Sequence, residues 1–148
     1  MKNNNGKLPI EDEIDVISVG KWSMVKHFKP LVNLLNKRAS FVTDNDGDVK
    51  AKHIIELEQN NADNIKIYYG NDNQKYTLEV CMFKDLKAGE NNNNLKKLLN
   101  KQNDNDDDVI KWMISNKTDW ALNVFNQYEN INFPQYILDA IKYAKGEK

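Results

Sequence analysis

Cysteine is nearly missing from this sequence: Cys81 is the single one, which excludes a disulfide framework within the chain and fits a reducing compartment. Long hydrophobic runs are missing as well, so no segment predicts a membrane span, and the polar residues 1–6 do not resemble a signal peptide. No charge dominates, because 21 Lys and Arg residues face 22 Asp and Glu residues. Nucleic acid would therefore need a local basic patch or a partner domain, and we expect a cytoplasmic protein with no membrane partner.

The composition that remains is that of an ordinary globular protein. With 148 residues, of which 40% are hydrophobic and 29% charged, we expect one domain with a modest core. Apolar runs predict strands, and segments of helical period lie between them: strands at 14–19, 39–43 and 65–69, helices at 22–38 and 50–59. Because strands and helices alternate, an α/β fold with a parallel sheet is expected.

After Gly70 the pattern becomes mostly helical. A helix is expected to begin in 77–86, a flexible break follows at 89–94, and further helices are predicted at 95–99, 109–115, 117–128 and 136–144. The acidic stretch 103–108 reads as a solvated connector. We therefore expect three parts: a linker or disordered segment at 1–13, an α/β core at 14–88, and a mostly helical extension of the same domain at 89–148.

The strand at 39–43 leads directly into an acidic loop, Asp44-Asn45-Asp46-Gly47-Asp48. In open α/β sheets functional groups gather at the carboxyl ends of strands. Asp44 and Asp46 are two residues apart and repel each other unless a cation neutralises them, and such oxygen ligands suit Mg²⁺ or Mn²⁺. Gly47 allows a sharp turn beside the ion, and Asp48 is either a third ligand or the cap of the next helix.

Four other interpretations of this acidic loop can be compared with the sequence. A solvated Asn/Asp/Gly turn that needs no metal is common and stays open. An EF-hand is excluded, since its glycine and carboxylate positions hold Val49 and Ile55. A haloacid-dehalogenase phosphatase matches poorly, because Asp48 stands where Thr or Val is typical. A nucleotide-sugar transferase motif stays possible but has no supporting donor-site pattern.

Several motifs in order resemble the TOPRIM nuclease domain of the OLD (overcoming lysogenization defect) family. They are the strand and glycine at 16–20, the helical Lys26-His27-Phe28, the strand with its acidic loop at 41–48, Tyr76-Thr77-Leu78-Glu79, the lysine segment at 116–121, and the closing segment at 133–141. The resemblance covers roughly residues 14 to 144. It implies a partial TOPRIM, Rossmann-like parallel sheet with helices, followed by the helical C-terminal part.

The resemblance also implies a function, namely two-metal cleavage of DNA phosphodiester bonds with Mg²⁺ or Mn²⁺ in an anti-phage or DNA-processing protein. Asp44 and Asp46 would bind metal, with Asp48 as a further ligand, and Thr77 and Glu79 would complete the second site. Glu79 and Lys117 would be catalytic, the lysine as a point charge on the phosphate or leaving oxygen.

Each of these residues also has a plain structural interpretation. Thr77 can cap a helix, Glu79 can be a surface carboxylate, and Lys117 can be one exposed lysine among many. His27 and His53 lie on predicted helices, where surface or packing roles are expected. Trp112 and Trp120 are expected in the core, not as platforms for bases.

The sequence departs from the family at its start. The first strand with its E-G-x-x-E-like glutamates has no counterpart in 1–13, and the ATPase motif G-x-x-x-x-G-K-[ST] is absent. An incomplete metal site and weak or no cleavage by the chain alone are therefore expected. The partners would be DNA together with an upstream ATPase/TOPRIM chain or a second copy. The alternative function is a non-catalytic TOPRIM remnant that binds a partner ATPase or nuclease chain, and a primase or topoisomerase is disfavoured.

Overall fold

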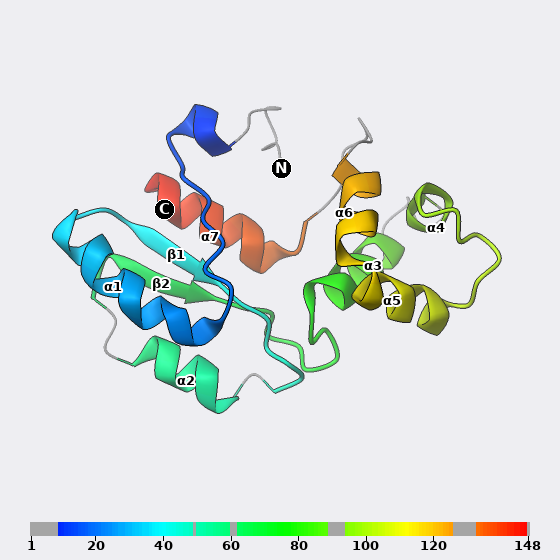
Figure 1. The fold of residues 1–148 in the computed structure, drawn as a ribbon, viewed down its shortest axis with the longest axis horizontal. Coiled ribbons are helices and arrows are strands. Elements are labelled where there is room, and N and C mark those ends of the chain that lie inside the picture. The colour runs from blue at the N-terminus through cyan, green and yellow to red at the C-terminus, as the bar shows by residue number, and fades with distance from the viewer. Residues whose placement is uncertain (1–8, 49, 60–61, 89–93, 126–132, 148) are drawn as a thin grey trace.

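The computed structural model describes residues 9–48, 50–59, 62–88, 94–125 and 133–147. These residues form two lobes, which lie side by side in Figure 1. The α/β lobe contains the strands β1 and β2 with the helices α1, α2 and α7. The helical lobe contains α3 to α6. Among the described residues no helix is long and apolar enough to cross a bilayer.

The α/β lobe is built on two parallel strands, β1 (Ala39–Val42) and β2 (Ile65–Tyr68), with Ala39 opposite Ile65. The helix α2 (Lys52–Glu58) makes the crossover between them and buries Ile54 and Leu57. The last helix, α7 (Gln135–Lys145), returns from the far end of the chain and packs on both strands (Figure 1). The expected mixed α/β class with a parallel sheet is present, although the sheet is small.

The strand predicted at 14–19 does not form. Residues 14–20 have no regular secondary structure and belong to no ladder, and the sheet of the described residues has only two strands. Val16 is 80% exposed and its neighbour Ile17 is 66% exposed. Because neither face of this segment is buried, its apolar residues gain little from pairing with β1. The preceding residues Pro9–Asp12 form a short 3₁₀ helix, η1, which the sequence did not predict.

The helix predicted at 22–38 is shorter and begins as a 3₁₀ turn. The turn η2 covers Trp22–Met24, and α1 covers Val25–Leu34 with Pro30 inside it. Pro30 has no N–H to donate to the preceding turn, so one helical hydrogen bond is missing there. The helix ends before Asn36, whose φ of 49° is left-handed and therefore incompatible with its continuation.

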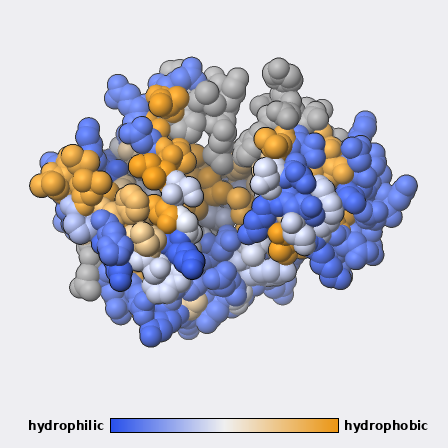
Figure 2. Space-filling view, in the orientation of Figure 1, coloured by the Kyte–Doolittle hydropathy of each residue, from blue (hydrophilic) through white to orange (hydrophobic). Residues whose placement is uncertain are grey.

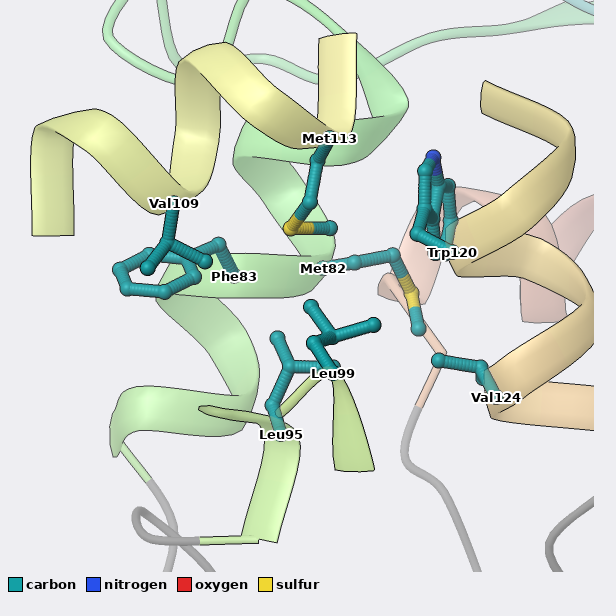
Figure 3. Packing of buried hydrophobic residues seen from close by; sticks show 8 residues of the cluster. All are labelled: Met82, Phe83, Leu95, Leu99, Val109, Met113, Trp120 and Val124. Atoms are coloured by element: carbon teal, nitrogen blue, oxygen red, sulfur yellow. The ribbon is translucent and has the colours of Figure 1, made fainter. Parts of the chain in front are cut away.

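The helical lobe has its own core, shown in Figure 3. Its helices are α3 (Leu78–Ala88), α4 (Asn94–Leu98), α5 (Asp106–Ser115) and α6 (Lys117–Phe125). Buried apolar side chains from all four helices form one cluster: Met82, Phe83, Leu95, Leu99, Val109, Met113, Trp120 and Val124. The prediction that Trp120 belongs to the core is confirmed, and Trp112 packs against the cluster partly buried.

The acidic stretch at 103–108 is only in part a connector. Asn105 caps α5 by accepting a hydrogen bond from the Asp108 N–H at 2.9 Å, and residues 106–108 are the first turn of the helix. Carboxylates favour this position because the helix N-terminus is partly positive. The sequence prediction was wrong here, since a good cap followed by three acidic residues is itself a helix-start signal.

Candidate functional site

A cleft of about 560 Å³ lies where the two lobes meet, in the middle of the face shown in Figure 2. Its walls come from elements that are far apart in the sequence: the segment before α1, the carboxyl end of β1, and the first residues of α3, α6 and α7. The lining residues are Gly20, Lys21, Trp22, Ser23, Val42, Thr43, Asp44, Asp46, Leu78, Glu79, Lys117, Tyr136 and Ile137. We call it the inter-lobe cleft.

The acidic loop that follows β1 is held in place by Asn45, whose side chain is buried. The Asn45 amide donates to the carbonyl oxygens of Gly70 at 2.7 Å and Asp72 at 3.0 Å, and its own oxygen accepts from the Gly47 N–H at 2.9 Å. Asp46 and Gly47 both have left-handed backbone, with φ of 51° and 85°. Glycine adopts this conformation without strain, which explains its place in the loop.

Asp44 is the first carboxylate of the loop and lines the cleft. Its side chain accepts a hydrogen bond from the N–H of Leu78, at the start of α3. Burial raises the pKa of Asp44, the nearby charge of Glu79 raises it further, and the charge of Lys117 opposes both. Asp44 is therefore electrostatically linked to residues that follow it by more than thirty positions.

Glu79 is the most unusual polar residue of the site, because it is only 4% exposed. Its Oε1 atom lies 3.7 Å from the Lys117 ammonium group, whose side chain is 65% exposed. Its Oε2 atom is buried and has no hydrogen-bond partner among the described residues. A buried carboxylate oxygen without a partner is costly, so this atom is available to a cation or a hydrogen-bond donor in the cleft.

Two residues that the resemblance implied as ligands lie outside the lining of the cleft. The exposed Asp48 accepts a hydrogen bond from the Lys50 N–H at 2.9 Å and helps to turn the chain toward α2. The Thr77 hydroxyl accepts from the Val80 N–H at 3.5 Å, a contact of the kind that caps a helix. The structure thus brings together Asp44, Asp46, Glu79 and Lys117. It leaves Thr77 in a contact at the start of α3 and Asp48 in a turn before α2.

His53 was not expected near the acidic loop, but it lies beside it. Its Nε2 atom is 3.3 Å from the carbonyl oxygen of Asp44 and 3.8 Å from the carboxylate of Asp46. The imidazole side chain is 12% exposed and packs against the Trp22 ring, with 5.8 Å between ring centroids. It lies in the first turn of the helix that follows the loop, but nothing local in the sequence indicates this contact.

Tyr136 is a second residue that sequence reasoning missed. It lines the cleft from the first turn of α7, and its hydroxyl donates to the sulfur of Cys81. Burial raises the pKa of Tyr136, and the negative field of Cys81 and Asp44 raises it further. Burial also raises the pKa of Cys81, to about 11, so both groups stay protonated at neutral pH and neither is a ready nucleophile.

A metal would find donors here, but not a complete set. Among the residues that the structure describes, no group of three or more His, Cys, Asp or Glu side chains is close enough to hold an ion. The partnerless oxygen of Glu79 and the carboxylate of Asp44, which interacts with the Glu79 charge, are oxygen donors of the kind that divalent cations prefer. Comparison with known protein families, curated proteins and solved structures finds no match to this chain.

Proposed function

We propose that the inter-lobe cleft is the catalytic site of a divalent-cation-dependent hydrolase that cleaves DNA phosphodiester bonds. This activity is the one expected of the C-terminal TOPRIM portion of an OLD-family endonuclease, to which the small parallel sheet would belong. The observation that carries the proposal is the Glu79 carboxylate, buried in the same cleft as Asp44 with one oxygen left without a partner. Such an arrangement is stable only when a cation or a donor satisfies that oxygen.

The roles of the side chains follow from their charges. Asp44 and Glu79 would hold Mg²⁺ or Mn²⁺, with Asp46 at the exposed side of the cleft. When bound, such an ion supplies a Lewis acid for the phosphoryl oxygen and lowers the pKa of a water molecule. Lys117 balances the charge of Glu79 and is exposed enough to contact a phosphate as well.

The site of the chain alone is expected to be weak. Two-metal cleavage needs enough carboxylates to hold two divalent ions, and the cleft offers Asp44, Asp46 and Glu79. We therefore propose that a partner chain completes the site, and that the isolated chain cleaves DNA slowly or not at all.

Calorimetric titration with Mn²⁺ tests the cation site directly. We expect Glu79→Gln and Asp44→Asn to lose Mn²⁺ binding, because each change removes one of the two charges that face the ion. Asp48→Asn is the matched control, since Asp48 is in the same loop but does not line the cleft. Equal Mn²⁺ affinity of Glu79→Gln and the wild type would exclude the proposed site.

A plasmid-nicking assay with Mg²⁺ or Mn²⁺ tests the reaction. The wild type is expected to nick weakly, and the double change Asp44→Ala with Asp46→Ala should abolish what activity there is. Robust nicking by the wild type that this double change abolishes would show that the chain needs no partner. Nicking that survives the double change would place the active centre elsewhere or in a contaminant.

A second candidate function, an interaction module for an ATPase or nuclease chain, is supported by the edge of β1. Among the described residues β1 is paired on one side only, with β2. Val42, at its end, is 49% exposed, and apolar Val16 and Ile17 are exposed as well. An open edge of this kind favours pairing with another strand. Light scattering of the chain with Val16→Lys distinguishes such association from catalysis, because Val16 is exposed and does not line the cleft.

A further inference from the structure

Trp22 is a partly exposed aromatic residue of the inter-lobe cleft. It lines the cleft between Lys21 and Ser23 and is 43% exposed. The 3₁₀ turn η2 begins at this residue, and the His53 ring supports one side of the indole at a tilt of 37°. The indole is thus held in place from behind while much of it faces solvent beside the candidate catalytic carboxylates.

The chain around Trp22 is basic although the whole protein is not. Residues 21–38 contain four Lys and one Arg and no acidic residue, in a chain of net charge −1. Lys29 is engaged, since it donates to the carbonyl oxygen of Leu57 at 2.7 Å. The other four are exposed: Lys21, Lys26, Lys37 and Arg38. Lys21 and Lys26 therefore make the chain positive next to Trp22, whereas Lys37 and Arg38 lie beyond the far end of α1.

From this arrangement we infer that Trp22 and the lysines beside it bind single-stranded nucleic acid and guide it into the cleft. An exposed aromatic ring beside a basic track is the combination that holds unpaired strands, because every base can stack on the ring. The volume of about 560 Å³ lies in the range of pockets for small molecules, which matches an unpaired nucleotide better than a duplex. The inference rests on the proposed function and names its substrate, an unpaired strand.

Fluorescence anisotropy with a labelled short oligodeoxythymidine tests the inference, in EDTA so that neither cation binding nor cleavage contributes. We expect the single strand to bind more tightly than a duplex of equal length. Trp22→Ala should weaken single-strand binding about tenfold, in keeping with the stacking energy of one base. Trp22→Phe should retain most of the affinity, because a base can still stack on its ring. Thermal melts of both variants show that they fold.

Met24→Ala is the matched control, because Met24 lies in the same turn, is 44% exposed and does not line the cleft. The affinity of Met24→Ala should equal that of the wild type. Lys21→Gln should reduce the salt dependence of the binding constant by the equivalent of about one phosphate contact. Equal affinity of Trp22→Ala and the wild type overturns the inference. So does tighter binding of the duplex, or binding to anionic lipid vesicles without binding to the oligonucleotide. If single-strand binding depends on Trp22 but the protein does not bind Mn²⁺, the inference holds and only the proposed function is contradicted.

Discussion

At the scale of single residues, Asp44 links the stability of the protein to pH. Burial and the charge of Glu79 raise its pKa above the ordinary value of 3.8. The unfolded chain has the ordinary pKa and the folded protein has the raised one. At a pH between the two, the folded state holds a proton that the unfolded state has released, so the free energy of unfolding falls as pH rises. Asp44→Asn should therefore raise the melting temperature by a few degrees at neutral pH and have little effect below the ordinary pKa.

Thermal melts of the two proteins across this pH range provide the measurement. Asp48→Asn serves as the control, because Asp48 is exposed and contacts only the local backbone of its turn. A melting temperature of Asp44→Asn that stays below the wild type at neutral pH would contradict the sign. Asp44→Asn is also expected to lose Mn²⁺ binding. The Asp44 carboxylate would then lower the stability of the protein while it binds the cation.

Asn45 stabilises the folded state through the hydrogen bonds of its neutral amide, whereas the buried charge of Asp44 destabilises it. Asn45→Ala leaves the Gly47 N–H and the Gly70 carbonyl without the partners that the buried amide supplied. We expect a loss of about 2–3 kcal/mol in the free energy of unfolding, measured by urea denaturation. Asn123→Ala, at an exposed position of α6, should change it little. A similar small change for Asn45→Ala would mean that the loop does not need this anchor.

The sequence predicted the carboxylates of the cleft better than their neighbours. Asp44, Glu79 and Lys117 were singled out by the expected resemblance to TOPRIM nucleases, and all three line one cleft in the structure. His53 and Tyr136 did not stand out, because a helical histidine or tyrosine has no local signal for the tertiary contact that it makes. Short-range patterns identify loops and caps, whereas contacts between distant elements depend on how the lobes meet.

At the scale of elements, the helical core of α3 to α6 depends on a few fully buried side chains. Met113 is 0% exposed, and its side chain points into the cluster toward Phe83 and Met82 in Figure 3. Met113→Ala should cost about 2–5 kcal/mol, because it leaves a cavity as well as losing apolar burial. Leu122→Ala, at a position of α6 that is 54% exposed, should stay within about 0.5 kcal/mol. Urea melts that rank the two variants equally would contradict the packing described above.

Helices and strands were predictable from the sequence where the spacing of apolar residues matches the residues that the fold buries. The strands at 39–43 and 65–69 were expected from their apolar residues, and the structure pairs β1 and β2 in parallel. The run at 14–19 is similarly rich in apolar residues but stays outside the sheet. A segment becomes a strand only when it pairs with another one, and its own residues do not specify that neighbour. The start of α5 at Asp106 was missed although Asn105 is a strong cap, since the acidic run was taken for a loop.

At the scale of the whole molecule, the sequence did not reveal that the C-terminal helices divide between two cores. The helices α3 to α6 pack together, whereas α7 crosses back and covers the sheet (Figure 1). The cleft exists only because of this division, since Asp44 comes from the α/β lobe and Glu79 and Lys117 come from the helical lobe. Sequence spacing alone does not specify such a return, because helices of similar period fit either lobe.

A cation in the cleft would therefore tie the two lobes together. A ligand that binds only the folded state stabilises it by about 2.7 kcal/mol at a hundred times its dissociation constant. We expect Mn²⁺ to slow amide hydrogen exchange both in the acidic loop and at the start of α3, because its ligands Asp44 and Glu79 lie on different lobes. Exchange measured with Mn²⁺ on Glu79→Gln should show neither effect. If Mn²⁺ slows exchange in the acidic loop of the wild type and leaves α3 unchanged, the ion binds Asp44 and Asp46 alone, and Glu79 is not its ligand.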